Sequence, residues 1–505
     1  MDFAFLGQFF MGLKLEDFKE AREAALADQI STYFTKPNEK LQYLGLAGVG
    51  RHGGALLFNE RDDDGKPVRK IIVKYSLTEE ADADLKNEAQ WLNHLKGAEH
   101  IVQVLTLPGA SVNVTGTGRR PTVALEFIPH GTIHEFQQRF ARFWENRGAD
   151  GTPTLMPARF LWCVFLCMVR QIAAMSFPPR ESNPTAENER EFPRTGAAIC
   201  NLTQNSPHSN NFVFDVLQEG DSEHDMIPRV KMIDFGRGKL EQKYGDAYMT
   251  NVWGAAYAIT CLALPFISDE KLRPAISEVE LTEPIVVGRE SHAVIYTEAS
   301  TLFTDMPLMD WKLRDTIARC MGTHPVTIPT LPELLAICED SVANRRLADF
   351  DLPDQPFLRD RESDRNLQAL VQHLVYDADA DAQQARASGR PLHNGQLGST
   401  LLGLGAAGRA APAPAPANHN VVWPGGGEGS AGGVGVRLAR VFAERLASSM
   451  FNARPAPAPA PTSEDEDDGK PKTLYEGFKR RINNMRKARK GRKRKPQRSP
   501  APSVD

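Results

Sequence analysis

Two segments of the chain carry residues whose types and spacing could bind a nucleotide together with a metal ion. Gly48, Gly50 and Gly53 form a GxGxxG pattern, and such a loop offers backbone N–H groups to phosphate oxygens. Asp234 follows the strand-like run 230–233 and begins the tripeptide Asp-Phe-Gly, where a carboxylate could hold Mg²⁺. Because a chain with 39 glycines produces such patterns by accident, the elements around each segment must decide.

The residues after the glycines favour a flap over a dinucleotide-binding turn. A dinucleotide fold needs a helix directly after its glycines. Here residues 55–58 predict a strand, Asp62–Pro67 an Asp-Gly turn, and residues 69–74 a second strand. We expect this hairpin to fold the glycines over a bound ligand.

A lysine and a glutamate in the next elements could form a pair. Lys74 ends an apolar strand, where an unpaired buried ammonium group would cost several kcal/mol. The helix predicted over 79–97 has an apolar stripe through Leu85 and Leu92, and Glu88 falls on that stripe. Glu88 either lies at the edge of the stripe in solvent or is paired. We expect an ion pair with Lys74 that directs the ammonium group at phosphate.

These segments, in this order, resemble the protein-kinase superfamily over about 300 of the 505 residues. The resemblance implies an α+β, bilobal fold, with a small antiparallel-sheet lobe carrying one helix and a mainly helical lobe. The predicted domains are a helical extension (1–40), the two lobes (41–127 and 128–345), a second helical extension (346–385) and a low-complexity tail (386–505).

The resemblance also implies a set of site residues and two cofactors, ATP and Mg²⁺. The segment 122–131 resembles the hinge that holds adenine through its backbone, and the apolar helix at 158–177 resembles the first long helix of the large lobe. The residues implied to bind the nucleotide are Gly48, Gly50, Gly53, Lys74, Glu88, Glu126 and Ile128, and those implied to bind the metal are Asn211 and Asp234.

The catalytic segment departs from the kinase pattern. Counting back from Asn211 places Ser206 where the family has its catalytic Asp, and no acidic residue occurs between Thr195 and Phe214. A serine is un-ionised at neutral pH, and losing a general base typically costs ~10²–10⁴ in rate. Only fourteen residues separate Gly236 from Asn251, which leaves no room for a long activation loop. The sequence therefore indicates nucleotide binding more firmly than phosphate transfer.

Three functions remain open on these grounds. The first is a pseudokinase-like ATP- and Mg²⁺-binding protein, catalytically impaired, that signals or scaffolds through an unknown protein partner. The second is an active phosphotransferase, acting on Ser/Thr in proteins or, as the less favoured version, on a small molecule; Ser206 counts against both versions. The third is a nuclear adaptor that acts through its tail.

The tail has a composition of its own. Residues 386–505 are rich in Gly, Ala and Pro, which predicts disorder, apart from a short helix at about 434–451. Residues 470–498 contain fourteen Lys or Arg and one acidic residue, while the rest of the chain has 46 basic and 63 acidic residues. We expect this segment to serve nuclear import or, alternatively, to contact nucleic acid non-specifically and in a salt-sensitive way.

Several protein classes are disfavoured. Asp2 stands where a secretory signal would carry a basic residue, and the most apolar stretch, 160–169, is too short to span a membrane. The six cysteines include no CxxC pair, and we expect Cys163 and Cys167 to pack in the core. We therefore expect an intracellular protein, nuclear or cytoplasmic, that does not bind membranes.

Overall fold

A computed structural model defines the structure of the protein. It describes residues 26–32, 34–35, 40–49, 53–107, 121–145, 155–179, 190–243, 245–268, 270–272, 274–287, 289–306, 308–350 and 360–377. Some predicted features lie outside these residues, namely Gly50, residues 1–25, the middle of the insert at 178–196, and the whole tail 386–505 with its helix at 434–451 and its basic segment 470–498.

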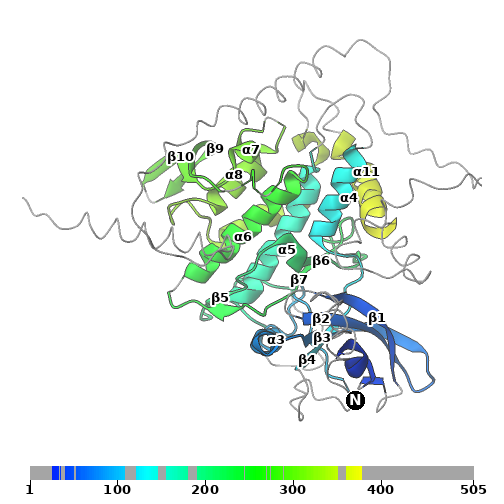
Figure 1. The fold of residues 1–505 in the computed structure, drawn as a ribbon. Coiled ribbons are helices and arrows are strands. Elements are labelled where there is room, and N and C mark those ends of the chain that lie inside the picture. Colours follow the sequence, from blue (N-terminus) through cyan, green and yellow to red (C-terminus); the bar gives the residue numbers. More distant parts are fainter. Residues whose placement is uncertain are drawn as a thin grey trace, which may run out of the picture. The chain divides into compact units, whose positions relative to one another are not determined.

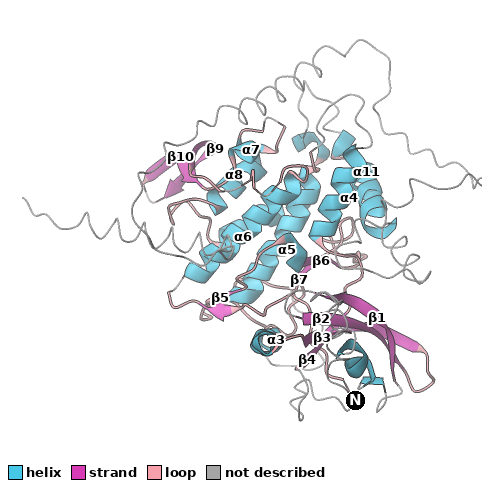
Figure 2. Ribbon diagram, in the orientation of Figure 1, coloured by secondary structure: helices cyan, strands magenta, loops and turns pink. Residues whose placement is uncertain are grey.

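The described residues form a mixed α+β structure with a small antiparallel sheet and several helices, in agreement with the predicted α+β class (Figures 1 and 2). Each strand of the sheet is antiparallel to its neighbour, and the strands follow chain order. They are β1 (Leu41–Val49), β2 (Gly53–Arg61), β3 (Pro67–Ser76) and β4 (Thr122–Glu126).

The predicted hairpin is present as β2 and β3, both longer than the sequence indicated. Asp62 closes its turn, because one carboxylate oxygen accepts hydrogen bonds from the backbone of Asp64 (3.0 Å) and Lys66 (2.8 Å). Gly65 has φ 78° there, a conformation that glycine adopts without strain. An apolar core lies on one face of the sheet and includes Phe58 and Val73, together with Ile30 and Phe34 from the N-terminal helical residues.

Helices form most of the remaining described structure. At the start of several helices a capping side chain accepts a hydrogen bond from a backbone N–H of the first turn. Thr78 accepts from the Ala81 N–H at the start of α3, and Thr330 and Glu333 form a capping box at the start of α9. The helices are α3 (Glu79–His94), α4 (Ile133–Glu145), α5 (Ala158–Ser176), α6 (Asp246–Ala263), α7 (Thr301–Thr304), α8 (Trp311–Cys320), α9 (Leu331–Ala343) and α11 (Asp364–Val371), with the 3₁₀ helices η1 (Ser209–Asn211) and η2 (Leu347–Phe350) and the π-helix η3 (Gln372–Asp377).

Helix α5 is the centre of the helical part. Its side chains are buried along almost its whole length, and it packs against α6 and α9. Phe160 on α5 stacks on Phe136 of α4, with ring centroids 4.9 Å apart. Among the described helices, α5 is long and apolar enough to cross a membrane, but 89% of its most apolar window is buried inside the protein. This burial agrees with the core helix predicted from the sequence.

Short strand pairs hold the segments that carry the predicted chemistry. β6 (Phe212–Phe214) pairs with β7 (Val230–Met232), and β5 (Leu202–Thr203) pairs with β8 (Lys239–Leu240). Ile101 forms a further bridge to Met232, so the chain after α3 also lies beside β7. These pairings bring the segment around residues 204–211 next to the one that begins at Asp234.

One element was not expected from the sequence. β9 (Ser277–Val287) and β10 (Glu290–Thr297) form a hairpin within the region predicted to be mainly helical. Its side chains alternate, with Val279 and Leu281 buried against α8 and the neighbouring Glu278 and Glu280 exposed. This period-two pattern is visible in the sequence and indicates a half-buried strand.

Gly48 and Gly53 of the GxGxxG motif have different surroundings. A Cβ atom on Gly53 would overlap the backbone carbonyl oxygen of Tyr75, whereas a Cβ on Gly48 would meet nothing within 4 Å. We expect Gly53→Ala to lower the free energy of unfolding by about 1–3 kcal/mol, because β3 would have to shift. Gly48→Ala is the matched control, and we expect it to change that free energy by less than about 0.5 kcal/mol. Urea unfolding of both variants checks this, and equal losses would contradict the packing role of Gly53.

Candidate functional site

The ion pair expected between Lys74 and Glu88 is present. Lys74 Nζ donates to both carboxylate oxygens of Glu88, each at 2.7 Å. Side chains alternate along β3, so Val73 enters the sheet core while Lys74 points to the opposite face, where α3 lies. The Glu88 side chain is 3% exposed and that of Lys74 is 27% exposed. The pair is thus buried on the carboxylate side and open on the ammonium side.

Asp234 lies close enough to this pair to act on both members. Burial would lower the pKa of Lys74, but the carboxylates of Glu88 and Asp234 outweigh it and raise that pKa above its usual value. Glu88 in turn accepts a hydrogen bond from the backbone N–H of Phe235, the residue after Asp234. Three charged groups from β3, α3 and the segment after β7 therefore converge.

The backbone at this point is in an uncommon conformation. Asn205 and Asp234 are the non-glycine residues with positive φ in the described structure, at 68° and 65°. Asn and Asp tolerate this left-handed region better than other side chains, yet such a conformation costs about 1–3 kcal/mol and is concentrated at functional sites. The turn after Asp234 is closed by its own carboxylate, which accepts from the Gly236 N–H at 3.3 Å.

Two residues of α3 hold the segment after Asp234, and no pattern in the sequence pointed to them. Asn87 Nδ2 donates to the carbonyl oxygens of Gly236 (2.9 Å) and Gly238 (2.8 Å). Trp91 Nε1 also donates to the Gly238 carbonyl, at 2.9 Å. Because Glu88 lies on the same helix, these bonds fix the carboxylate of the ion pair and Asp234 relative to each other.

The segment 204–211 is held against Asp234 by side-chain amides. Gln204 Nε2 donates to the Asp234 carbonyl at 2.8 Å, and its Oε1 accepts from the Ser206 N–H at 2.8 Å. Asn211 Nδ2 donates to the Ser206 carbonyl at 2.8 Å, and the Asn211 carbonyl accepts from the Ile233 N–H at 2.8 Å. Asn211 and Asp234, the two expected metal ligands, therefore come from adjacent backbone segments, with Ser206 beside them.

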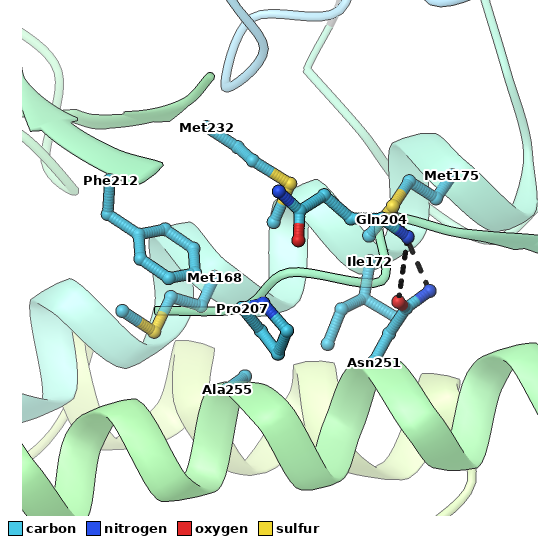
Figure 3. A pocket seen from close by; sticks show the side chains of 9 residues that line it. All are labelled: Met168, Ile172, Met175, Gln204, Pro207, Phe212, Met232, Asn251 and Ala255. Atoms are coloured by element: carbon cyan, nitrogen blue, oxygen red, sulfur yellow. Dashed lines mark hydrogen bonds between the residues drawn. The ribbon is translucent and has the colours of Figure 1, made fainter. Parts of the chain in front are cut away.

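A small pocket lies beneath this segment, between α5 and α6 (Figure 3). The polar side chains at its wall are Gln204 and Asn251, and the Asn251 Oδ1 accepts from the Gln204 N–H at 3.3 Å. Asn251 Nδ2 donates to the Leu202 carbonyl at 2.9 Å. Methionine and other apolar side chains make up the rest of the wall, which suits packing under the segment better than binding a charged ligand. The lining residues are Met168, Ile172, Met175, Gln204, Pro207, Phe212, Met232, Asn251 and Ala255.

His208, which belongs to none of the predicted site residues, lies in the same segment. His208 is exposed, and its Nε2 lies 3.5 Å from the Asn211 Nδ2. Desolvation of the ring lowers its pKa below 6.5, against the opposing effect of the Asp234 charge, and Arg237 lowers it further. His208 is therefore a neutral proton acceptor at neutral pH, close to both expected metal ligands. Its position two residues after Ser206 could have been noticed in the sequence.

The expected hinge residues lie at the end of β4. The Glu126 side chain is engaged inside the protein, since it accepts from Lys231 Nζ (2.8 and 2.9 Å) and from the Gln103 N–H (2.9 Å). This contact ties β4 to β7. Ile128, two residues later, is partly buried. The prediction that the backbone of Glu126 and Ile128 holds adenine is untouched by these side-chain contacts and stays a prediction.

Two of the three glycines of the GxGxxG motif, Gly48 and Gly53, lie in the described structure. Gly48 is the penultimate residue of β1 and Gly53 the first of β2, so they flank the turn that contains Gly50. Gly53 packs tightly against the backbone of Tyr75, and its predicted contact with phosphate remains a prediction.

No protein-family model matches the chain, and a search of the curated proteins finds no match either. Function therefore has to be inferred from the site itself.

Removing the ammonium group of the ion pair tests how strongly it stabilises the fold. Lys74→Met leaves the Glu88 carboxylate buried without its partner, and we expect the free energy of unfolding to fall by about 3 kcal/mol. This is the lower end of the range for broken buried pairs, because Lys74 is partly exposed. The double variant Lys74→Met/Glu88→Leu removes the buried charge as well, and we expect it to recover most of that loss. Urea unfolding at neutral pH measures both; an equal loss in the single and double variants would contradict the pairing energetics.

Proposed function

We propose that the protein is a protein-kinase-like protein that binds ATP with Mg²⁺, has little phosphotransfer activity, and acts in signalling or scaffolding. The observation that carries this proposal is the Lys74 ammonium group, which is held between the Glu88 and Asp234 carboxylates and open on one side. A fixed ammonium group beside a carboxylate suits a ligand that brings both phosphate oxygens and a metal ion. The site would then bind Mg·ATP in preference to either component alone.

The order and pairing of the elements support a bilobal kinase-like arrangement. The sheet β1–β4 with α3 contributes Lys74 and Glu88, and the chain that follows β4 contributes Asn211 and Asp234. In such an arrangement the nucleotide would lie between the two parts, with adenine at Glu126 and Ile128. Nothing in this proposal requires the side chain of Glu126, which is bonded to Lys231.

The donor atoms at the site fit Mg²⁺. This ion takes oxygen ligands, and proteins usually provide one or two carboxylates while the substrate phosphates and water supply the rest. Asp234 offers a carboxylate, and Asn211 uses its amide nitrogen to bond the Ser206 carbonyl, so its amide oxygen is the atom left for a cation. The bound ion would neutralise phosphate charge. Asn211 and Asp234 would hold it, and Lys74 would bind a phosphate oxygen directly.

The contacts of Ser206 support impaired catalysis. Its backbone N–H and C=O are bonded to Gln204 and Asn211, which holds this segment in place. The resemblance to protein kinases implies that the catalytic Asp would stand at the position of Ser206. The Ser206 hydroxyl cannot take up a proton as a carboxylate does. Binding of nucleotide without efficient transfer is the outcome that these residues favour.

His208 favours an active phosphotransferase as a second candidate function. In this alternative the neutral ring accepts the proton of the attacking hydroxyl group, the hydroxyl oxygen bonds to the terminal phosphorus, and ADP leaves. The ring lies beside Asn211 and within the influence of Asp234. A nuclear adaptor, the third possibility, depends on residues 470–498, which lie outside the described residues.

Nucleotide-dependent stabilisation tests the proposed binding. We expect Mg·ATP at about 100 times its dissociation constant to raise the free energy of unfolding by about 2.7 kcal/mol. Asp234→Asn is the appropriate variant, because Asn tolerates the φ of 65° that Ala would adopt only with strain. We expect it to keep the stability of the free protein and to lose the Mg²⁺-dependent part of the stabilisation. Absence of any stabilisation of the wild type at millimolar Mg·ATP would contradict the proposal.

The pH dependence of phosphate release from ATP distinguishes the second candidate. Since only the unprotonated ring can accept a proton and its pKa is lowered, we expect any activity to rise with pH through a midpoint below 6.5 and to be constant above it. His208→Gln should abolish this rise and lower the rate by ~10²-fold or more. His134→Gln is the control, since His134 is a neighbouring histidine that lies 3.5 Å from the Ser209 hydroxyl. A residual rate and pH profile unchanged in His208→Gln would rule out His208 as the base.

A further inference from the structure

Two histidines from distant parts of the chain face each other in the interior. His100 lies between α3 and β4, and His224 lies in the connection between β6 and β7. They are 0% and 1% exposed, and their Nε2 atoms are 3.0 Å apart. Two nitrogens bound to one tetrahedral zinc ion lie roughly 3.3 Å apart, given Zn–N bonds of about 2.0–2.1 Å. The pair is therefore close to the separation that a shared metal ion requires.

A cysteine completes a group of three possible ligands. The ligand atoms of His100, His224 and Cys167 all lie within 4.8 Å of one another, and all three residues are buried. Cys167 Sγ accepts a hydrogen bond from the Val230 N–H at 3.4 Å. Burial raises the pKa of the Cys167 thiol, and the backbone N–H directed at the sulfur opposes that shift. The thiolate is the form that binds metals, so the metal ion has to displace the thiol proton.

The far side of the His100 ring is held in the way typical of metal-binding histidines. Glu191 Oε2 lies 2.7 Å from His100 Nδ1, and its Oε1 accepts from the His100 backbone N–H, also at 2.7 Å. Burial raises the pKa of Glu191 to about 7, and the hydrogen bond from the His100 N–H opposes that shift. In its ionised form Glu191 accepts from the ring Nδ1–H and fixes the tautomer in which the other nitrogen carries a lone pair. That second nitrogen, Nε2, is the one that faces His224.

The two histidine rings are uncharged in the interior. Burial lowers the pKa of both rings to about 3, so both are neutral at physiological pH, as metal ligands must be.

The surroundings can accommodate a cation. The charged groups around the two rings are the carboxyl groups of Glu99, Glu191, Asp221 and Glu223 and the guanidinium groups of Arg170, Arg190 and Arg229. Each guanidinium group is paired with a carboxylate, since Arg170 bonds to Glu223 at 2.6 Å, Arg190 to Asp221 at 2.6 Å, and Arg229 to Glu99. A divalent ion with one thiolate ligand adds a single positive charge to a shell whose cations are already paired.

We propose that His100, His224 and Cys167 form a structural metal site for Zn²⁺ or a chemically similar divalent ion. Two imidazole nitrogens and one thiolate are the ligand types that zinc prefers. Binding replaces the thiol proton by the metal, so one proton is released to solvent for each ion bound. Cys163 lies one helical turn before Cys167, and its thiol feels the charges of Glu223 and Asp225, the two neighbours of His224. The fourth ligand is either Cys163 or a water molecule.

The position of the site gives it a mechanical role. It would join α5, the segment before β4 and the connection before β7, all of which are close in space and distant in sequence. The Met232 N–H donates to the His100 carbonyl at 2.9 Å, and Asp234 follows Met232 by two residues. A metal ion here would hold the strand that precedes Asp234. This role does not depend on whether Asp234 takes part in binding Mg·ATP.

Titration of the EDTA-dialysed full chain with Co²⁺ tests the site. Cobalt has visible absorption in a tetrahedral site, and a thiolate ligand adds a charge-transfer band in the near ultraviolet. We expect one Co²⁺ per chain with both features, and displacement by Zn²⁺. Cys167→Ser should lose the charge-transfer band if water is the fourth ligand, and half of its intensity if Cys163 is. His224→Phe, which keeps an aromatic ring, should weaken binding by more than ~100-fold. Glu191→Gln, behind His100, should weaken it by ~10–100-fold.

Two further variants serve as a control and as a test of which group is the fourth ligand. Cys320→Ser removes an equally buried thiol on α8 and should leave binding unchanged. Cys163→Ser should halve the charge-transfer intensity if Cys163 is the fourth ligand and leave it unchanged if water is. The wild type alone can overturn the proposal, whether or not the variants fold. Uptake of less than one Co²⁺ per chain, or uptake without a thiolate band, would mean that the histidines form only a hydrogen-bonded pair. Binding retained in His224→Phe would also overturn it.

Discussion

The Lys74 ammonium group lies between two carboxylates that come from different elements, and the arrangement around it depends on this electrostatic contact. Glu88 bonds to it at 2.7 Å through both oxygens, and Asp234 raises its pKa from the other segment. A buried carboxylate such as Glu88 is tolerated only with a partner and hydrogen bonds. The Phe235 N–H donates a hydrogen bond to Glu88, and Asn87, on the same helix as Glu88, bonds to the segment after Asp234. A change in any one of the three elements would therefore move the others.

The segment opposite Lys74 is fixed by amides where the protein-kinase pattern has charged groups. Gln204 links the Ser206 backbone to the Asp234 carbonyl, and Asn251 supports Gln204 from α6. Amides can hold backbone in place without taking up or releasing a proton. In the proposed function these amides position the nucleotide and the metal ion, and His208, beside Asn211, is the group considered for accepting a proton. This division between positioning and proton transfer is why binding is proposed with more weight than catalysis.

Local patterns made part of this structure predictable. The Lys74–Glu88 pair follows from a lysine at the end of an apolar strand and a glutamate on an apolar stripe, and α5 follows from its uninterrupted apolar length. The hairpin β9–β10 was missed although its alternation is visible. The contacts of Asn87 and Trp91, and the cluster of His100, Cys167 and His224, join residues far apart in sequence. No local period marks such residues, so only the folded chain reveals them. Gly53 illustrates the reverse case, since a motif suggested phosphate binding and the structure adds a packing cause against Tyr75.

The central claim is that the Lys74 amine contacts the phosphates of a nucleotide bound next to Asp234. An ATP analogue with an acyl group on its terminal phosphate tests this directly, because a lysine amine that reaches the acyl carbon forms an amide and releases the nucleotide. Mass spectrometry of the digested full chain then identifies the acylated lysine. We predict acylation of Lys74 that excess Mg·ATP suppresses. Acylation of other lysines only, or labelling of Lys74 that Mg·ATP leaves unchanged, would contradict the account.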